Sequence, residues 1–471
     1  MDNKMQNKTK NKKQIRKCRC LISLLIVAVS ICLTGCEWKK ALRDEKEPLV
    51  EFVTDELVYN GEINVLDISA MSGGTGKEGI DSFRKCLDEW REKNPSIVVN
   101  EEQFEAESYN RELSKRITTD NMPDIFIVGS MEAADLAASG NLLDITEYIR
   151  GSKDTTLYNY DYLFPYTYDK HYYAIPAYAA TTQTILIYNS SLWNEAGYDM
   201  IPETWEEYAK ADKYFEKQQI DTVVFAGADK KRITDHFLSS FGCQYTGLSW
   251  YKSVLNKEFD FESDSFKEAI TDTKKLFNES GIICEDYMEL TNKEALERFI
   301  DGRAAAVIGN YEDVKFLDNQ LEPEGKENMG FAALPHFAKL EYTHPFSDKS
   351  LPYGIAISSK LAADPEKMDA CVDLILYLTG SEYARILQDD HMLLGFTQPE
   401  EKPAGMGSVQ LRLYRFMYEE SIRCESYRTV MNSDVWNEFD DGLRKLLNSE
   451  EETVDDFTME MQSHYMVWCR K

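Results

Sequence analysis

The stretch YAIPAYAATTQTILIYNSSLWNEAGYDMIPETW, residues 173–205, decides the fold. Its first four residues form a short apolar strand that ends in Pro176. A second apolar strand runs from Thr184 to Tyr188, after a connector rich in Ala and Thr. Because so few residues separate the two strands, we expect the chain to leave one sheet there and to enter another.

The residues after the second strand predict two helices. Asn189 and the two serines that follow it offer side-chain oxygens that can cap a short helix over residues 192–196. Gly197 can end that helix in the left-handed conformation. A proline turn then leads to Thr204, which can cap a longer helix that begins with Trp205.

This order of strand, connector, strand, short helix and Pro-x-Thr-Trp closely resembles the signature of the family 1 extracellular solute-binding proteins. These are the sugar-binding subunits of bacterial ABC importers, of which the maltose-binding type is the best known. The resemblance implies an α/β chain with the two-lobed type II periplasmic-binding-protein fold, in which each lobe is a mainly parallel sheet flanked by helices and several strands form the hinge. It also implies that the protein captures a carbohydrate between its lobes and delivers it to the permease subunits of an ABC transporter.

Further motifs extend the resemblance over nearly all of the chain from Ile63 onward. Residues 295–305 repeat the family's Phe-x-x-Gly-Arg-Ala-Ala pattern, and residues 330–335 and 351–358 resemble two of its later strands. The matches predict an N-terminal lobe of residues 61–177 plus 311–353 and a C-terminal lobe of residues 184–308 plus 356–471. Hinge crossovers are expected near residues 178–183, 309–310 and 354–355.

The first 60 residues predict export and a lipid anchor. Residues 1–19 hold eight Lys and Arg, residues 21–33 form an apolar run too short to span a membrane, and Leu33-Thr34-Gly35-Cys36 matches the bacterial lipobox. We therefore expect a lipoprotein signal peptide over residues 1–35, fatty acyl chains such as palmitate at Cys36, and a lipid-anchored spacer over residues 36–60. The protein would face outward from the cell membrane. An uncleaved anchor with an incidental Cys36 is the alternative.

Composition limits the possible partners. The net charge of −29 includes the basic N-terminus, so the rest of the chain is more acidic still. Such a surface repels nucleic acid and anionic membranes. The 471 residues, of which 43% are hydrophobic, are enough for two or three cores of ordinary size. We expect a monomer whose partners are a small carbohydrate and the permease, with no nucleic acid.

The cysteines and histidines predict no metal site and no cofactor. None of them shows ligand spacing. Cys86 and Cys371 lie in helical patterns, where buried free thiols are expected. The spacing of the six cysteines after Cys36 leaves their disulfide pairing open, because six allow fifteen pairings; they are Cys86, Cys243, Cys284, Cys371, Cys424 and Cys469.

Positions at the predicted cleft edges supply the candidate ligand-binding residues. Aromatic rings can stack on the CH faces of a pyranose, and hydroxyl or amide groups can bond its hydroxyls. The candidates are Tyr178, Trp250, Tyr311 and Tyr353 as stacking rings, with Ser72, Gly73, Ser130 and Asn310 around them. With 27 Tyr and 22 Phe in the chain, packing in the core is the competing interpretation for each ring.

Catalytic motifs are absent from the sequence, so we expect no enzyme. The six histidines are scattered, and neither HExxH nor GxSxG occurs. A surface glycan-binding or sensory lipoprotein without a transport role is the alternative function. A glycoside-active hydrolase is less favoured, although paired carboxylates cannot be recognised from spacing alone. The identity of the solute, whether sugar or not, and the partner permease stay open.

Overall fold

The computed structural model describes residues 57–68, 75–130, 132–151, 160–178, 181–182, 184–340, 344–351, 353–391, 406–431 and 433–470. The predicted signal peptide, the lipobox with Cys36, the spacer up to residue 56, and Ser72 and Gly73 of the predicted site all lie outside these residues. Among the helices of the described residues, none is long and apolar enough to cross a membrane.

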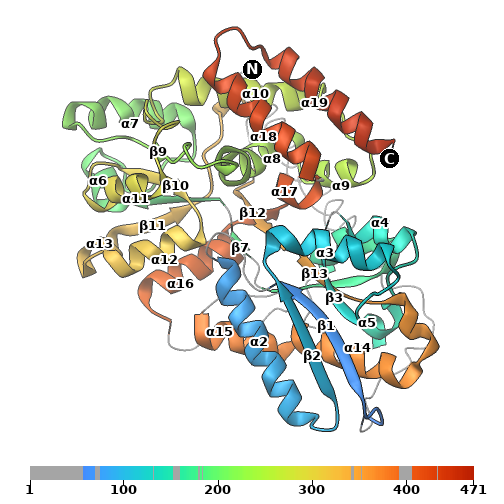
Figure 1. Ribbon diagram of the computed structural model, residues 1–471. Helices are drawn as coiled ribbons and strands as arrows, with labels where there is room; N and C mark the ends of the chain where they lie inside the picture. Colours follow the sequence, from blue (N-terminus) through green and yellow to red (C-terminus); the bar gives the residue numbers. More distant parts are fainter. Residues whose placement is uncertain are drawn as a thin grey trace, which may run out of the picture. The chain divides into compact units, whose positions relative to one another are not determined.

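The first sheet has five strands in the order β2-β1-β3-β13-β6 (Figure 1). Strand β1 pairs in parallel with β2 and β3, whereas β13 runs antiparallel to both β3 and β6. Apolar residues such as Ile63, Leu66 and Ile355 are fully buried here. The strands are β1 (Glu62–Ile68), β2 (Val98–Phe104), β3 (Ile125–Gly129), β6 (Ala174–Pro176) and β13 (Tyr353–Ile357).

The second sheet has four strands in the order β11-β8-β10-β9. Strand β8 is antiparallel to both of its neighbours, and β10 is parallel to β9. Both sheets are therefore mixed, although mainly parallel sheets were predicted, because chain segments that return from the other lobe run against the strands they join. The strands are β8 (Ile185–Asn189), β9 (Val224–Phe225), β10 (Ala306–Gly309) and β11 (Met329–Ala332).

A third sheet has three strands. Two of them lie in segments of the chain that connect strands of the first sheet with strands of the second. The strand order of this third sheet is β14-β12-β7, with β12 parallel to β14 and antiparallel to β7. Strand β7 (Thr181–Thr182) lies between β6 and β8, and β12 (Phe346–Ser350) lies between β11 and β13. Strand β14 (Ile422–Cys424) follows after a long helical segment. A separate hairpin joins β4 (Thr167–Tyr168) to β5 (His171–Tyr172).

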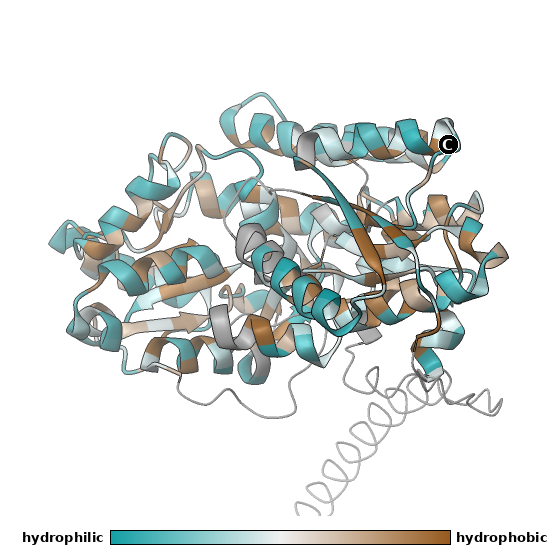
Figure 2. Cartoon of the chain, turned by 60° about the horizontal axis from the view of Figure 1, so that its bottom comes forward, coloured by the Kyte–Doolittle hydropathy of each residue, from teal (hydrophilic) through white to brown (hydrophobic). Residues whose placement is uncertain are grey.

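Helices cover both main sheets, and the hydropathy colours show brown strands and mixed outer helices (Figure 2). Contacts assign one group to the first sheet: α2 (Thr75–Lys93), α3 (Ala106–Thr118), α4 (Ala133–Ala138), α5 (Thr146–Gly151), η2 (Tyr160–Tyr166), η5 (Ser359–Ala363), α14 (Pro365–Thr379) and α15 (Ser381–His391). The other described helices are α6 (Ser190–Glu195), α7 (Trp205–Gln218), η3 (Thr234–Leu238), α8 (Ser239–Thr246), α9 (Trp250–Leu255), α10 (Asp264–Asn278), α11 (Asn292–Ile300), α12 (Tyr311–Gln320), α13 (Pro323–Asn328), η4 (Ala338–Leu340), α16 (Ser408–Arg415), η6 (Phe416–Glu420), α17 (Tyr427–Val430), α18 (Ser433–Asn448) and α19 (Val454–Cys469).

Most local signals in residues 173–205 form as predicted. The side chain of Asn189 accepts hydrogen bonds from the first amides of α6, and Gly197 has a φ of 93°. Thr204 lies at the N-cap position of α7, but its side chain does not cap the helix amides as predicted; its hydroxyl instead donates to the Glu207 carboxylate over 2.9 Å. Trp193 on α6 and Trp205 on α7 are both buried, and each packs on Tyr208. The two helices therefore attach to one another through an aromatic cluster.

The strand pairing corrects the predicted division into lobes. Residues 311–353 were assigned to the first lobe, but β11 pairs with β8 in the second sheet. The chain does not cross at residues 309–310, because Asn310 caps α12 and α12 packs on β10. Part of the range 356–471, which was predicted to belong to the second lobe, belongs to the first, because α14 and α15 pack on α2 beside the first sheet. The return crossing instead runs from β11 through β12 to β13.

Candidate ligand-binding site

One edge of the first sheet gathers the ends of four strands (Figure 1). Strands β1 and β3 are parallel, and they end there at Ile68 and Gly129. Strand β13 starts at the same edge, where Tyr353 lies opposite Gly129, and Gly354 pairs with Pro176 at the end of β6. Side chains just beyond these ends are thus brought to one place, the usual location of ligands in α/β sheets.

Tyr178 and Asp67 form the polar centre of this edge. The Tyr178 hydroxyl donates a short hydrogen bond to Oδ1 of Asp67, and the backbone amide of Ile68 donates to the same oxygen over 2.7 Å. Tyr178 has a φ of 66°, a conformation that residues other than glycine rarely adopt. The strained backbone conformation of Tyr178 is therefore stabilised by the contacts that its side chain makes with the first sheet.

Asp67 is fully buried, and burial raises its pKa to about 7. The hydrogen bonds from Tyr178 and Ile68 act in the opposite direction, because they favour the charged carboxylate. Arg84 lies 3.5 Å from the second oxygen, Oδ2, and its guanidinium also bonds the carbonyl of Ile68. Burial therefore has a larger effect on this carboxyl group than the hydrogen bonds and the nearby guanidinium, which favour its charged form.

Tyr178, which bonds this carboxyl group, packs between two further aromatic rings. Tyr178 makes edge contacts with Phe83 at 5.3 Å and with Tyr353 at 6.3 Å between ring centroids. Tyr178 is only 2% exposed, whereas Tyr353 is partly exposed. Of this predicted pair, Tyr353 offers a ring face to solvent, and Tyr178 holds it in position.

Ser130 joins the first sheet to the helices of the second lobe. It follows Gly129 at the end of β3, and its hydroxyl donates to the carbonyl of Thr429 on α17 over 2.8 Å. Two further contacts lie between the same parts: Phe164 of η2 meets the ring of Tyr251 on α9 at 5.6 Å, and the Arg423 guanidinium stacks over Tyr162. These contacts hold the lobes together beside the candidate site.

Asn310 and Tyr311 lie at the end of β10 in the second sheet. The Asn310 side chain accepts from the amide of Asp313, and the Asp313 carboxylate accepts from the Asn310 amide, which closes a capping box at the start of α12. Asp313 also pairs with Arg232 over 2.6 Å, with both side chains buried. Tyr311 is 7% exposed, and burial raises its pKa. Asn310 thus serves as a helix cap, and Tyr311 packs in the protein interior.

Trp250 lies in an aromatic cluster of the second lobe. Its ring lies 4.3 Å from that of Tyr427, which stacks on Phe439 at 5.0 Å. Trp250 is 2% exposed. The structure therefore brings Ser130, Tyr178 and Tyr353 together at the sheet edge, while Trp250, Asn310 and Tyr311 lie on elements of the second lobe.

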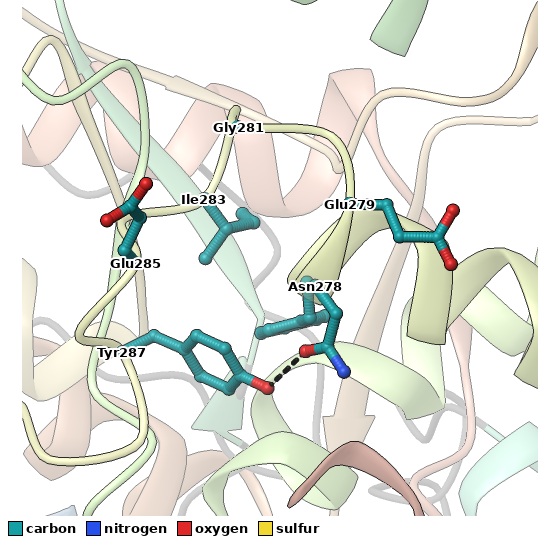
Figure 3. A pocket seen from close by; sticks show the side chains of 7 residues that line it. Asn278, Glu279, Gly281, Ile283, Glu285 and Tyr287 are labelled. Atoms are coloured by element: carbon teal, nitrogen blue, oxygen red, sulfur yellow. Dashed lines mark hydrogen bonds between the residues drawn. The ribbon is translucent and has the colours of Figure 1, made fainter. Parts of the chain in front are cut away.

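A surface pocket of about 410 Å³ lies away from the candidate residues, between the end of α10 and the loop that follows it (Figure 3). The Tyr287 hydroxyl donates to Oδ1 of Asn278 over 2.9 Å, and the Asn278 amide in turn donates to the carbonyl of Leu447. Glu279 and Glu285 flank the opening. The amide of Asn278 and the phenol of Tyr287 thus form hydrogen bonds within the protein. No predicted site residue lines the pocket.

Sequence reasoning missed Asp67 and Thr429. Asp67 lies in the strand INVLDI, where one acidic residue interrupts an apolar run, and that interruption was its only signal. Thr429 contributes a backbone carbonyl to Ser130, and any residue type could do so. Such a contact leaves no trace in the sequence.

The two mixed sheets, the sheet of crossing segments and the helices around them define the class of protein: an α/β chain with the two-lobed type II periplasmic-binding-protein fold. The structure resembles a family 1 extracellular solute-binding protein from Bifidobacterium longum subsp. infantis, with a TM-score of 0.69 and 16% identity over 86% of this chain and 99% of that one. A chitin oligosaccharide binding protein gives a TM-score of 0.67 at 17% identity, over 86% of this chain and 98% of that one.

The family follows from the sequence comparison. The model of the bacterial extracellular solute-binding proteins matches residues 75–384, more than half of the chain, so the chain belongs to this family. A curated relative, the diacetylchitobiose binding protein DasA of Streptomyces coelicolor, is 22% identical over 289 residues. The match covers 60% of this chain and 63% of that relative's length.

Proposed function

We propose that this protein is a lipid-anchored, extracytoplasmic receptor that captures a carbohydrate between its lobes and delivers it to an ABC transporter permease. Membership of the solute-binding family supports the receptor role. The names of its relatives, which include diacetylchitobiose and chitin oligosaccharide binding proteins, favour a sugar as the solute. The lipobox at Cys36 supports the anchor.

The observation that carries the proposal is the group Asp67, Tyr178 and Tyr353 at the sheet edge, next to the sheet of crossing segments. The partly exposed Tyr353 ring offers a flat face for the CH groups of a pyranose, and Asp67, which is fully buried, holds Tyr178 beside that ring. The crossing segments β7 and β12 pair directly with one another, so they can act as a hinge.

Binding would then exchange contacts between the lobes. In the structure the Ser130 hydroxyl bonds the carbonyl of Thr429. We expect a sugar hydroxyl to replace Thr429 as the partner of Ser130, with Tyr353 stacked on the ring. Ser72 and Gly73, which follow β1 in the sequence, are further proposed contacts. The ligand touches both lobes only when they are close, so binding favours the closed arrangement.

A panel of oligosaccharides tests the ligand class. Chito-, malto- and xylo-oligosaccharides and galactose should include at least one sugar that raises the melting temperature, since at a hundredfold excess over Kd a ligand adds about 2.7 kcal/mol to the free energy of unfolding. Calorimetric titration should give the same Kd. If no sugar changes the melting temperature while another class of solute does, the carbohydrate assignment is wrong.

Two variants locate the site. Tyr353→Ala and Ser130→Ala should each weaken the sugar identified in this way by roughly tenfold or more, which corresponds to about 1.4 kcal/mol. Tyr377→Ala on α14 and Ser139→Ala after α4 are matched controls, because their hydroxyl groups bond Lys93 and the carbonyl of Asp135, away from the sheet edge. Equal affinities in all four variants would place the site elsewhere.

Uptake and fractionation separate transport from surface binding. Cys36→Ser should release the protein from membranes, and loss of the gene should abolish uptake of the sugar. Normal uptake with loss of binding at the cell surface would instead indicate a glycan-binding or sensory lipoprotein.

A further inference from the structure

Two buried cysteines, far apart in the sequence, lie against one another in the second lobe. Cys243 lies on α8 and Cys424 on β14, and each is 1% exposed. The Cys424 Sγ lies 3.9 Å from the carbonyl oxygen of Ser239 and 3.9 Å from Oγ of Ser240. Ser239 is one helical turn before Cys243, so Cys243 lies on the face of α8 that Cys424 contacts.

Neighbouring contacts fix this arrangement of α8 and β14. Oγ of Ser240 donates to the Asp348 carboxylate over 3.1 Å, and Asp348 is the partner of Cys424 in the pairing of β12 with β14. The Tyr427 hydroxyl lies close to Gly242, where an added Cβ would come within 3.1 Å of it. Burial raises the pKa of the Cys424 thiol, and the nearby Cys243 raises it further.

The other cysteines have different surroundings. The Cys86 thiol bonds the carbonyl of Tyr377 at 3.6 Å, and the Cys469 thiol lies 4.0 Å from the carbonyl of Lys257. Cys371 is buried on α14, and burial raises its pKa. All six cysteines of the described residues are free thiols in the structure, and the Cys424 Sγ lies against the helix that carries Cys243.

We propose that Cys243 and Cys424 form a disulfide when the exported chain folds. The family is extracellular, and extracytoplasmic compartments permit such bonds. The oxidant is a disulfide, either a thiol oxidoreductase or a small-molecule disulfide. One cysteine thiolate attacks it and releases a thiolate, and the second cysteine then attacks the mixed disulfide and releases the other. Each cysteine loses one proton, and the electron pair leaves on the oxidant, which becomes a dithiol.

The bond must form before the core closes. Both thiols are buried in the folded protein, so an oxidant cannot reach them there, and the raised pKa of Cys424 leaves little thiolate at that residue to react. Oxidation therefore belongs to folding. Once formed, the bond ties β14, an edge strand of the crossing sheet, to α8 of the second lobe. In that case β14 would stay fixed to the second lobe, and hinge motion would occur in β7 and β12.

Peptide mapping of the exported protein tests the pair without any substitution. The protein is unfolded in guanidinium with an alkylating reagent and no reductant, and then digested with trypsin. We expect peptide 233–252 joined to peptide 424–428, with Cys86 and Cys371 alkylated as free thiols. Free thiols at both Cys243 and Cys424, including after refolding with oxidised glutathione, would overturn the proposal, as would a different pairing.

Melting temperatures give a second readout. Protein refolded with oxidised glutathione should melt about 3 to 8 °C above protein refolded in reductant, because the cross-link closes a long loop. Cys424→Ser should abolish that difference, and Cys371→Ser, which removes a buried thiol outside the pair, should retain it. A difference that survives in Cys424→Ser would contradict the assignment.

Discussion

At the residue scale, the Tyr178 hydroxyl is the group that most directly controls Asp67. We expect Tyr178→Phe to lower the free energy of unfolding by about 1 to 3 kcal/mol, because the buried carboxyl group loses a hydrogen-bond donor. Urea unfolding measures this loss. Tyr198→Phe is the control and should cost much less, because the Tyr198 hydroxyl makes a longer, part-buried bond of 3.3 Å to the carbonyl of Glu207, a neutral acceptor.

Asp67 also makes stability depend on pH. Burial raises its pKa from 3.8 to about 7, so the folded state binds the proton more tightly than the unfolded state does. This contribution to stability is fully present below about pH 4 and is lost as the pH rises through 7. Asp67→Asn should therefore flatten the profile of stability between pH 4 and 7, by roughly 2 to 4 kcal/mol.

Denaturant unfolding at several pH values checks the slope. Asp348 is also fully buried, and burial raises its pKa to about 7, so it produces a slope of the same sign that remains in Asp67→Asn. Asp348→Asn serves as the comparison, and the double variant should have a smaller slope than either single variant, with a remainder from other carboxyl groups whose pKa is raised, such as Glu132 and Glu312. An unchanged slope in Asp67→Asn would mean that the carboxyl group titrates normally.

At the scale of the element, variants of Asn310 at the start of α12 distinguish a capping role from contact with the ligand. Asn310→Ala should lower the free energy of unfolding by about 1 kcal/mol, because the helix loses its side-chain acceptor. Asn310→Asp retains an acceptor at the same place and should be close to wild type in thermal unfolding. If both variants weaken sugar binding equally with no change in stability, Asn310 contacts the ligand instead of serving only as a cap.

At the scale of the whole molecule, Phe164 links the two lobes. Its ring contacts Tyr251, and the Lys252 amine lies 5.4 Å from its centroid. Phe164→Ala should shift the population toward open forms and weaken the sugar severalfold, because the binding-competent fraction falls. Calorimetric titration measures the change. Phe316→Ala, at a ring that is 39% exposed on α12, is the control and should bind normally.

The local elements could be predicted because their signals are local. The Asn189 cap, the turn at Gly197 and the helix from Trp205 each depend on a few neighbouring residues, and the structure confirms them. Gly302, with a φ of 68°, ends α11 in the same way. The family resemblance then supplied the fold class, which local patterns alone would not have given.

The lobe boundaries and the polar centre of the site could not be predicted from the sequence, because both depend on contacts between distant parts of the chain. An apolar strand such as β11 fits either sheet, and only its pairing with β8 assigns it to the second. Likewise, an acidic residue in a strand is exposed or buried depending on what packs on it. Asp67 is buried because Tyr178, 111 positions further along the chain, reaches back to it.

The position of β13 has a consequence for secretion. This strand lies between β3 and β6, yet it is synthesised only after every strand of the second sheet. Until it emerges, β3 and β6 lack the neighbour that joins them, so the first sheet cannot be completed before residue 357 has been synthesised. Such a late, long-range closure slows folding. For the exported chain that we propose, we expect the interleaved order to leave the first sheet incomplete, and the chain therefore easier to translocate, until β13 has been made.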